Sequence, residues 1–175
     1  MGSSESFSTL TVQEFLASLA ADTPAPGGGA AIALACAFAA ALVEMAGTLS
    51  RDHDAGDRMP ELRARAAAAR ARAVRLADED AVAYRKVIAA QRLPVEDPSR
   101  PQRVAGALSE AADVPRAIAE TAAEVAEMAS EVAATGNPNL RGDAHAGALL
   151  AEAAAQAAAG LVEINLAAAA DALRR

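Results

Sequence analysis

The stretch Pro24-Ala25-Pro26-Gly27-Gly28-Gly29-Ala30 decides how this chain is organised. Its prolines exclude a helix up to Pro26, and its glycines let the backbone turn sharply and approach a neighbour closely. An apolar run follows from Ala30 to Leu49, interrupted by a single charge at Glu44. Because a helix that is apolar on all sides belongs in the centre of a fold, the sequence predicts a central helix that begins at the glycine turn.

The start of this helix is also a candidate binding site. The first backbone N–H groups of a helix have no partner within it, and glycines leave them uncovered. Pro26, Gly27, Gly28 and Gly29 could therefore hold a carbonyl or carboxylate oxygen of a ligand. The glycines could instead serve only the close packing of helices, and the stretch alone favours that simpler interpretation.

Composition and charge narrow the class of protein. Aromatic residues make up 2% of the 175 residues, and Trp is absent, so the core is expected to consist of closely packed Ala-rich helices rather than a sheet. The net charge of −7 argues against a nucleic-acid partner. The single Cys36 excludes an intrachain disulfide and is expected to be a small buried apolar residue. We expect one cytoplasmic domain over residues 1–175, with residues 1–9 flexible and no membrane span, since Glu44 and the many alanines disfavour one.

The periodicity of apolar residues predicts an all-α bundle of about five helices, one short and four long. The short helix follows Thr11, whose spacing to Glu14 matches a capping box. Pro115 is expected to kink or break the fourth helix, and Gly136 to end it as a C′ residue. The second and fifth helices are the two Ala-rich central ones. The long helices are expected from about Gly28 to Ser50, from Pro60 to Arg92, from a capping box of Ser99 and Gln102 to Thr135, and from Asp143 to Leu173.

Two acidic features have alternative interpretations. Asp80 falls on or beside the apolar stripe of the third helix, where a carboxylate is either paired or functional; position alone favours a paired acid. In the loop after the second helix, Asp52 and Asp54 are spaced like the first ligands of an EF-hand, but Arg63 stands where the last ligand belongs. A solvated loop that binds no metal is expected there. The predicted stripe of the third helix comprises Leu62, Ala66, Ala69, Ala73, Leu76, Asp80, Tyr84, Val87 and Ala90.

Several segments together resemble one enzyme family. Pro24-Ala25-Pro26-Gly27-Gly28-Gly29 resembles the Pro-x-Pro-Gly-Gly-Gly motif of the formiminotetrahydrofolate cyclodeaminase and methenyltetrahydrofolate cyclohydrolase family. Within residues 78–84, the chain resembles the family's Asp-x-x-Ala-Phe segment, with Tyr84 in place of Phe. The remaining matches follow in family order: Leu93-Pro94, Val114-Pro115, Gly136-Asn137-Pro138-Asn139 with Asp143-Ala144, and Ile164-Asn165-Leu166.

The resemblance implies a helical bundle, usually a homodimer, that acts on a folate without metal or cofactor. It implies either closure of the folate ring with loss of ammonia, or addition of water to a methenyl carbon. Each reaction needs a group that moves protons, which a carboxylate of raised pKa could supply. The alternatives are an enzyme of the same fold with another substrate, and a ligand-binding or scaffold protein without catalysis.

The resemblance assigns roles to particular residues, and two departures from the family bear on them. Asp143 and Asp80 are predicted as the acidic groups of one pocket. Asn137 and Asn139 are predicted as substrate-binding residues, in addition to those of the glycine turn. Asp143 could instead be only a helix cap. His145 replaces a family glycine, and could be a general base or a solvent-facing residue. The family's lysine-rich loop is here the acidic segment 52–57, which predicts weak binding of polyglutamate tails.

Overall fold

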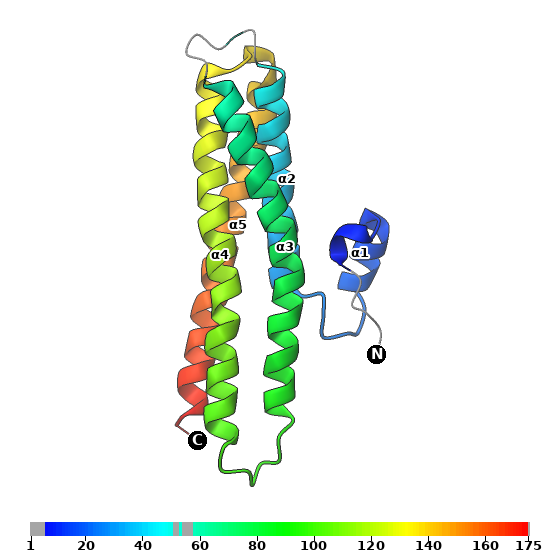
Figure 1. The fold of residues 1–175 in the computed structure, drawn as a ribbon, viewed down its shortest axis with the longest axis vertical. Helices are drawn as coiled ribbons and strands as arrows, with labels where there is room; N and C mark the ends of the chain where they lie inside the picture. The colour runs from blue at the N-terminus through cyan, green and yellow to red at the C-terminus, as the bar shows by residue number, and fades with distance from the viewer. Residues whose placement is uncertain (1–5, 51–52, 54–57, 175) are drawn as a thin grey trace.

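The computed structural model describes residues 6–50, 53 and 58–174, and its long elements are all helices (Figure 1). No strand occurs in the described ranges, so the predicted all-α fold class is confirmed. The acidic segment 52–57, with the calcium alternative, lies outside the described residues apart from His53. The elements are η1 (Phe7–Thr9), α1 (Val12–Leu19), α2 (Gly28–Thr48), α3 (Met59–Gln91), α4 (Arg100–Thr135), η2 (Pro138–Leu140) and α5 (Arg141–Ala172).

The four long helices form an elongated bundle that is not uniform along its length. α2 has 21 residues, whereas α3, α4 and α5 have 33, 36 and 32. As a consequence α2 occupies only one half of the bundle, and α3, α4 and α5 continue beyond its first residue (Figure 1). The short α1 stands to the side of the bundle near the start of α2 (Figure 1). The beginning of α2 therefore lies midway along the molecule, where a fourth helix joins three others.

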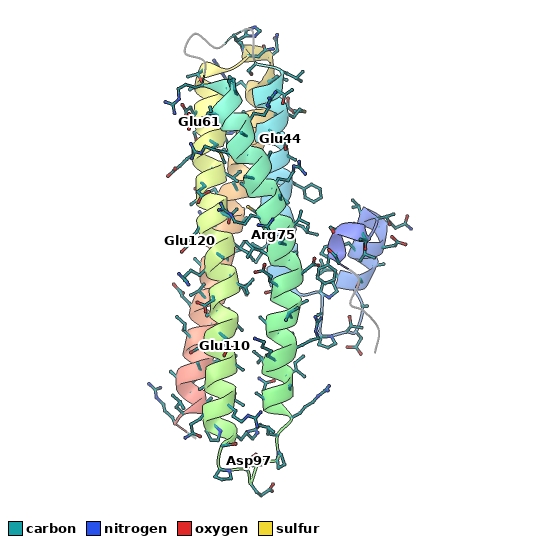
Figure 2. All side chains as sticks on the ribbon, viewed as in Figure 1. Glu44, Glu61, Arg75, Asp97, Glu110 and Glu120 are labelled. Carbon is teal, nitrogen blue, oxygen red and sulfur yellow. The ribbon has the colours of Figure 1, made fainter. Side chains whose placement is uncertain are left out.

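The core consists mainly of alanine, as the composition predicted. Ala33, Ala40 and Ala46 of α2 are fully buried, and Met59 and Met128 are among the largest buried side chains. Cys36 is buried too, and burial raises the pKa of its thiol to about 11, so it behaves as an apolar residue rather than a nucleophile. Charged side chains such as Glu61, Glu110 and Glu120 point away from the bundle (Figure 2).

The pairing of α2 with α5 is antiparallel and has a clear register. A Cβ on Gly147 of α5 would lie 3.3 Å from the Ala39 carbonyl oxygen and 3.4 Å from Val43 Cγ2. Eleven residues further along α5, Ala158 belongs to the same core cluster as Ala30 and Ala33. Gly147 thus lies level with residues 41–42 of α2, and the start of α5 lies beside the end of α2.

The stripe predicted for α3 is mostly correct. Leu62, Leu76 and Val87 are buried, with the alanines between them. Tyr84 is the exception, since its side chain is 47% exposed and Ala81 takes the buried position instead. The capping box of Thr11 and Glu14 is present as predicted.

Of the two predictions about the ends of α4, the capping box at its start is wrong, and the prediction for its end is correct only in part. Ser99 makes no capping bond, because its N–H and hydroxyl both donate to Asp97 Oδ1, at 2.8 and 2.7 Å. α4 ends at Thr135 as predicted, but Gly136 is its C-cap residue with a φ of −83°, rather than a C′ residue in the left-handed conformation. A Cβ at this position would lie 2.7 Å from Ser50 Oγ and from the Val132 carbonyl oxygen. At Gly136, glycine is therefore needed for close approach to Ser50 rather than for a left-handed φ.

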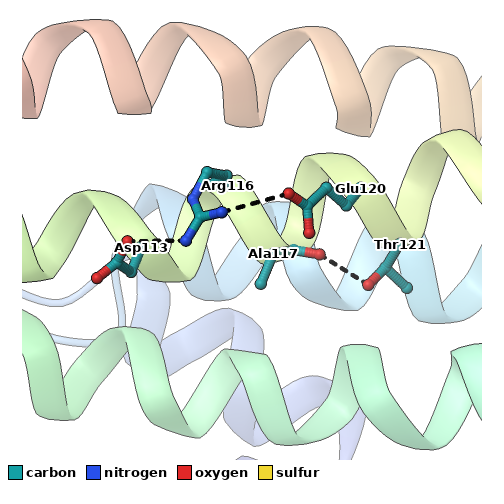
Figure 3. Close-up of polar contacts among 5 residues, drawn as sticks. All are labelled: Asp113, Arg116, Ala117, Glu120 and Thr121. Atoms are coloured by element: carbon teal, nitrogen blue, oxygen red, sulfur yellow. Dashed lines mark hydrogen bonds and ion pairs between the residues drawn. The ribbon is translucent and has the colours of Figure 1, made fainter.

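α4 also continues through Pro115 rather than breaking there, and α5 supplies part of the reason. Pro115 has no N–H, so the carbonyl of Ala111 lacks its donor within the helix. Asn165 of α5 donates from Nδ2 to that carbonyl oxygen at 3.3 Å. On the next turns, Arg116 contacts both Asp113 and Glu120, and the Thr121 hydroxyl donates to the Ala117 carbonyl (Figure 3). The Ile-Asn-Leu segment of α5 thus contacts α4 one turn before the Val-Pro segment.

Two helical segments are long and apolar enough to span a membrane by length and composition alone. They are Gly28–Thr48 and Pro138–Ala172. In Gly28–Thr48, 50% of the most apolar 18-residue window is buried inside the structure. In Pro138–Ala172, only 17% of the corresponding window is buried. Each leaves large apolar side chains exposed, including Phe38 on α2 at 56% and Leu149 on α5 at 54%. The Ala-rich helices therefore line the core on one side and carry an uncovered apolar side.

Candidate active site at the start of α2

The glycine turn and Asp80, which are far apart in the sequence, are in contact in the structure. Both belong to the candidate site predicted from the sequence. The N–H of Ala30, in the first turn of α2, donates to Asp80 Oδ2 of α3 at 3.1 Å. Asp80 has no cationic partner among the described ion pairs. Its structural role is therefore to cap α2 from a neighbouring helix, where the positive end of the helix dipole favours a carboxylate.

The glycines of the turn have different functions. A Cβ on Gly29 would overlap the Asp80 carboxylate, so only glycine permits this cap. A Cβ on Gly27 or Gly28 would meet no atom within 4 Å. Pro26 is buried and follows a cis peptide bond to Ala25. Close packing thus explains Gly29, but leaves Gly27 and Gly28 facing open space.

Two donors at this helix end remain available. Gly28 and Gly29 occupy the first two positions of α2, where a backbone N–H has no acceptor within the helix. In the described part of the chain neither N–H has a hydrogen-bond partner, whereas the next two are used by Asp80 and the Gly27 carbonyl. The turn can therefore donate to one oxygen of a ligand next to the Asp80 carboxyl.

The Asp80 carboxyl is electrostatically suited to exchange protons. Burial raises its pKa above the ordinary 3.8, and the hydrogen bond from Ala30 offsets only part of this. A carboxyl of raised pKa can donate a proton at a pH where an exposed aspartate is fully ionised. Asp80 thus combines a structural cap with the properties of an acid–base group.

Asp78, one of the acids preceding Asp80, has a separate task that the sequence did not reveal. Its Oδ2 accepts from the Ser6 hydroxyl at 2.5 Å, and its Oδ1 from the Phe7 N–H at 2.7 Å. This anchors η1 against α3, and Phe7 packs edge-to-face on Phe15 with ring centroids 5.6 Å apart. Residues 6–9, expected to be flexible, are tied to the bundle in this way, and residues 1–5 lie outside the described chain.

The second predicted turn lies at the opposite end of α2 and has a different character. Ser50 is fully buried; its hydroxyl donates to the Ala46 carbonyl at 2.6 Å and accepts from the Asn137 N–H at 2.8 Å. The Asn137 side chain accepts from the Asn139 N–H at 3.0 Å and donates to the Leu49 carbonyl at 3.4 Å. Asn137 therefore joins this turn to the end of α2, while the Asn139 side chain is exposed.

Asp143 and His145 follow this second turn and do not reach Asp80 within one chain. The cap residue of α5 is Leu140, so the alternative that Asp143 is the cap of this helix is wrong. Asp143 lies in the first turn and is half-buried. His145 is exposed. From the α2–α5 register, Asp143 is level with residues 45–46 of α2, about 25 Å from Gly29 at 1.5 Å per residue. A single pocket holding both acids of the same chain is thus excluded.

Sequence reasoning also missed Ser50 and Asn165, for a common reason. Each satisfies a backbone group on a distant element, and neither stands in a local pattern that predicts such a partner. The only local indication was the polarity of Asn165 in an otherwise apolar segment.

The cavities of the bundle do not coincide with the glycine turn. The largest described one, about 670 Å³, lies where α3, α4 and the end of α5 meet, and is lined by Gln91, Arg100 and Asp171 among others. It contains none of the predicted residues. A mostly apolar groove of about 330 Å³ between α1 and α2 begins at Ala31 and extends to Phe38. Among the residues that the structure describes, only the glycine turn combines unpaired donors with a titratable group of raised pKa.

Comparison with known proteins relates the whole bundle to one group. Residues 11–175 match the family described as Formiminotransferase-cyclodeaminase. Methenyltetrahydrofolate cyclohydrolase of Methylorubrum extorquens is 32% identical over 163 residues, covering 89% of this chain and 78% of that protein. Formimidoyltransferase-cyclodeaminase of Sus scrofa is 31% identical over 140 residues, but this chain spans only 26% of its length. The crystal structure of formiminotetrahydrofolate cyclodeaminase from Thermotoga maritima has a TM-score of 0.82 at 28% identity, covering 95% of this chain and 88% of that one.

Proposed function

The chain belongs to the formiminotransferase-cyclodeaminase family, and we propose that it is a folate one-carbon enzyme, either a formiminotetrahydrofolate cyclodeaminase or a methenyltetrahydrofolate cyclohydrolase. The observation that carries this proposal is the carboxyl of Asp80 beside unpaired N–H groups at the glycine turn. The transferase activity in the name of the pig relative is not proposed, since this chain spans only 26% of that protein.

Both reactions move protons around one carbon atom held between two folate nitrogens. In the cyclodeaminase reaction, the formimino carbon is carried by one of these nitrogens. The other nitrogen attacks this carbon and loses a proton, which closes the ring, and the departing amine gains a proton and leaves as ammonia. In the cyclohydrolase reaction, water adds to the methenyl carbon and one C–N bond then breaks. Asp80 is the proposed proton carrier in either case, because burial raises its pKa and its carboxyl lies beside the open donors of the glycine turn.

The glycine turn would orient the substrate. The N–H groups of Gly28 and Gly29 can donate to a carbonyl oxygen such as that of the pterin ring. Donors on the backbone hold an oxygen without losing side-chain entropy, so they suit a positioning role. Gly27 leaves the approach to them open.

The remaining properties are part of the same proposal. We propose a cytoplasmic homodimer that works without metal or cofactor, as a lyase if it releases ammonia and as a hydrolase if it adds water. The family resemblance supports the absence of a cofactor, and the uncovered apolar sides of α2 and α5 support the dimer. Dialysis against a chelator should leave activity unchanged, and light scattering should give twice the chain mass.

The test is to assay purified protein with both folates. Release of ammonia from the formimino compound identifies a cyclodeaminase, and loss of methenyl absorbance a cyclohydrolase. Asp80→Asn should keep the cap on α2, because an amide oxygen also accepts from Ala30, but should lower turnover by about 10². The matched control is Asp78→Asn, which removes a carboxylate two residues away that anchors η1 instead. If the wild type converts neither compound, the folate proposal is wrong.

A different substrate is the second candidate, favoured by one feature of the sequence. Lys86 is the only lysine, and segment 52–57 is acidic where the family carries lysines. Polyglutamate tails should therefore add little affinity. Equal dissociation constants for mono- and polyglutamate forms at low salt would agree with this, and a strong gain with tail length would contradict it.

A further inference from the structure

We infer that Tyr84 of α3 is the residue on which the flat ring of the substrate stacks while an oxygen of that ring is held at the glycine turn. This inference rests on the proposed function, because it names a side chain that would bind the pterin of a folate. It adds an aromatic surface to the backbone N–H groups and the Asp80 carboxyl at the start of α2.

The first observation is the place of Tyr84 on α3. It follows Asp80 by four residues, and such residues are neighbours on one face of a helix, about 6 Å apart along its axis. Asp80 contacts the first turn of α2 through the Ala30 N–H. Because α3 continues past the first residue of α2 (Figure 1), Tyr84 lies just beyond the glycine turn.

The second observation is the exposure of Tyr84. Leu76, four residues before Asp80 on the same face, is buried in a cluster that includes Ala30 and Ala33 of α2. Tyr84 belongs to this face but is 47% exposed, because α2 begins too late to cover it. The face of α3 that is core beside α2 therefore presents an accessible aromatic ring next to the candidate site.

The third observation concerns direction. The N–H groups in the first turn of a helix point out of its N-terminus, so those of Gly28 and Gly29 are directed past the start of α2. A side chain on a helix leans toward the N-terminus of that helix, so Tyr84 is inclined back toward Asp80 and the turn. A planar ligand whose oxygen accepts from the turn would thus extend beside the ring of Tyr84.

The chemistry of Tyr84 suits such a ligand. Within the part of the chain that the structure describes, its hydroxyl makes no hydrogen bond and its ring has no aromatic partner. A pterin is a flat aromatic ring with polar edges, and rings of this kind stack on tyrosine as nucleobases do. The edge of the pterin would bind the glycine turn, and its face would bind Tyr84.

This contact would position the substrate rather than move protons. A stacked ring attracts the substrate about equally before and during the reaction, and such uniform binding affects KM rather than kcat. The proposed role of Asp80 in proton transfer predicts the opposite pattern, so kinetics can separate the two residues.

Intrinsic fluorescence tests the contact without any assay. Trp is absent and Tyr84 is the only tyrosine, so the tyrosine emission of the protein comes from this one side chain. We expect folic acid to quench it in a saturable manner, and p-aminobenzoylglutamate, which lacks the pterin, to quench it much less. Free tyrosine titrated in parallel corrects for light absorbed by the ligand. Quenching by folic acid that only matches the loss for free tyrosine would overturn the inference.

Substitutions test the role of the ring. Tyr84→Leu should raise the dissociation constant of folic acid, measured by calorimetry, and the KM for the substrate by about 5- to 150-fold, with kcat little changed. Tyr84→Phe should recover most of the lost affinity, because it keeps the ring. Val82→Ala is the matched control, since Val82 is also 47% exposed but lies between Asp80 and Tyr84 in sequence and on another face of α3.

The outcomes separate this inference from the proposed function. A Tyr84→Leu protein that binds folic acid like the wild type would overturn the inference, and turnover by the wild type would still support the proposed function. An equal loss in Tyr84→Phe and Tyr84→Leu would overturn stacking, because the hydroxyl rather than the ring would then bind. A wild type that binds folic acid through Tyr84 but converts neither folate would support the inference and refute the proposed function. If it neither binds nor converts a folate, both are wrong.

Discussion

Each end of α2 lies beside a polar turn, but the two turns treat their polar groups differently. At its end, Ser50 and Asn137 use their hydrogen bonds on each other and on the backbone of α2. At its start, Asp80 binds only the Ala30 N–H, and the N–H groups of Gly28 and Gly29 stay unpaired in the described chain. A turn with satisfied polar groups is a structural joint, whereas unpaired donors beside a carboxyl of raised pKa form a site that can receive a ligand.

The largest expected effect comes from filling the start of α2. In Gly29→Ala the new Cβ would overlap the Asp80 carboxylate, so Asp80 must move away from the turn. We expect turnover to fall by at least about 10² and the free energy of unfolding by about 1–3 kcal/mol, the usual range for overpacking. Steady-state kinetics and urea denaturation measure the two effects.

Gly28→Ala is the matched control, because a Cβ there meets no atom within 4 Å. Its stability should be unchanged within about 0.5 kcal/mol, as for most substitutions away from packed positions. If Gly29→Ala behaved like Gly28→Ala in both measurements, the close approach of Asp80 to the turn would be incorrect.

At the other end of α2, a substitution that disturbs the packing should lower the stability of the protein. Gly136→Ala places a Cβ 2.7 Å from Ser50 Oγ and from the Val132 carbonyl, and should lower the free energy of unfolding by about 1–3 kcal/mol. Gly142→Ala, whose Cβ meets nothing within 4 Å, should be neutral or stabilising. A Gly136→Ala protein with the wild-type melting temperature would show that this turn is not a packed joint.

A smaller effect is expected where Pro115 meets Asn165. Asn165→Leu removes the donor to the Ala111 carbonyl and should cost about 1 kcal/mol, a typical value for one hydrogen bond. Pro115→Ala restores a backbone N–H for that carbonyl, so the cost of Asn165→Leu should shrink in this background. A double-mutant cycle on the free energy of unfolding measures the coupling, and strict additivity would show that the two residues act independently.

The smallest effect is a change of stability with pH that arises from Asp80. Since burial raises its pKa in the folded state, the folded chain binds the proton more tightly than the unfolded chain. Its contribution to stability is therefore fully present below the ordinary pKa of 3.8 and is lost as the pH rises through the folded pKa. Relative to the wild type, Asp80→Asn should become more stable between acid and neutral pH, as followed by thermal melts. An unchanged difference across this range would mean that the pKa of Asp80 is not raised.

Local sequence patterns were sufficient for the helices and for one half of the candidate site. The capping box of Thr11 and Glu14 depends on residues three apart, and it formed as predicted. The position of Asp80 beside an apolar stripe follows from helical periodicity, and its burial follows from that. The pattern of Ser99 and Gln102 failed because a nearer acceptor, Asp97, captures both donors of Ser99. Such competition depends on loop geometry, which residue types alone do not specify.

The sequence by itself determined an all-α bundle, the glycine turn at the start of its most apolar helix, and the family, because these depend on periodicity and on motifs within short segments. The tertiary structure decided which motifs meet. It joined Gly29 to Asp80 across 51 positions of sequence, Asn137 to Ser50, and Asn165 to the carbonyl freed by Pro115. It also separated Asp143 from Asp80, because the length and antiparallel register of α2 and α5 put the two turns at opposite ends of one helix. Contacts of this kind arise from the packing of helices in three dimensions, and no local pattern in the chain encodes them.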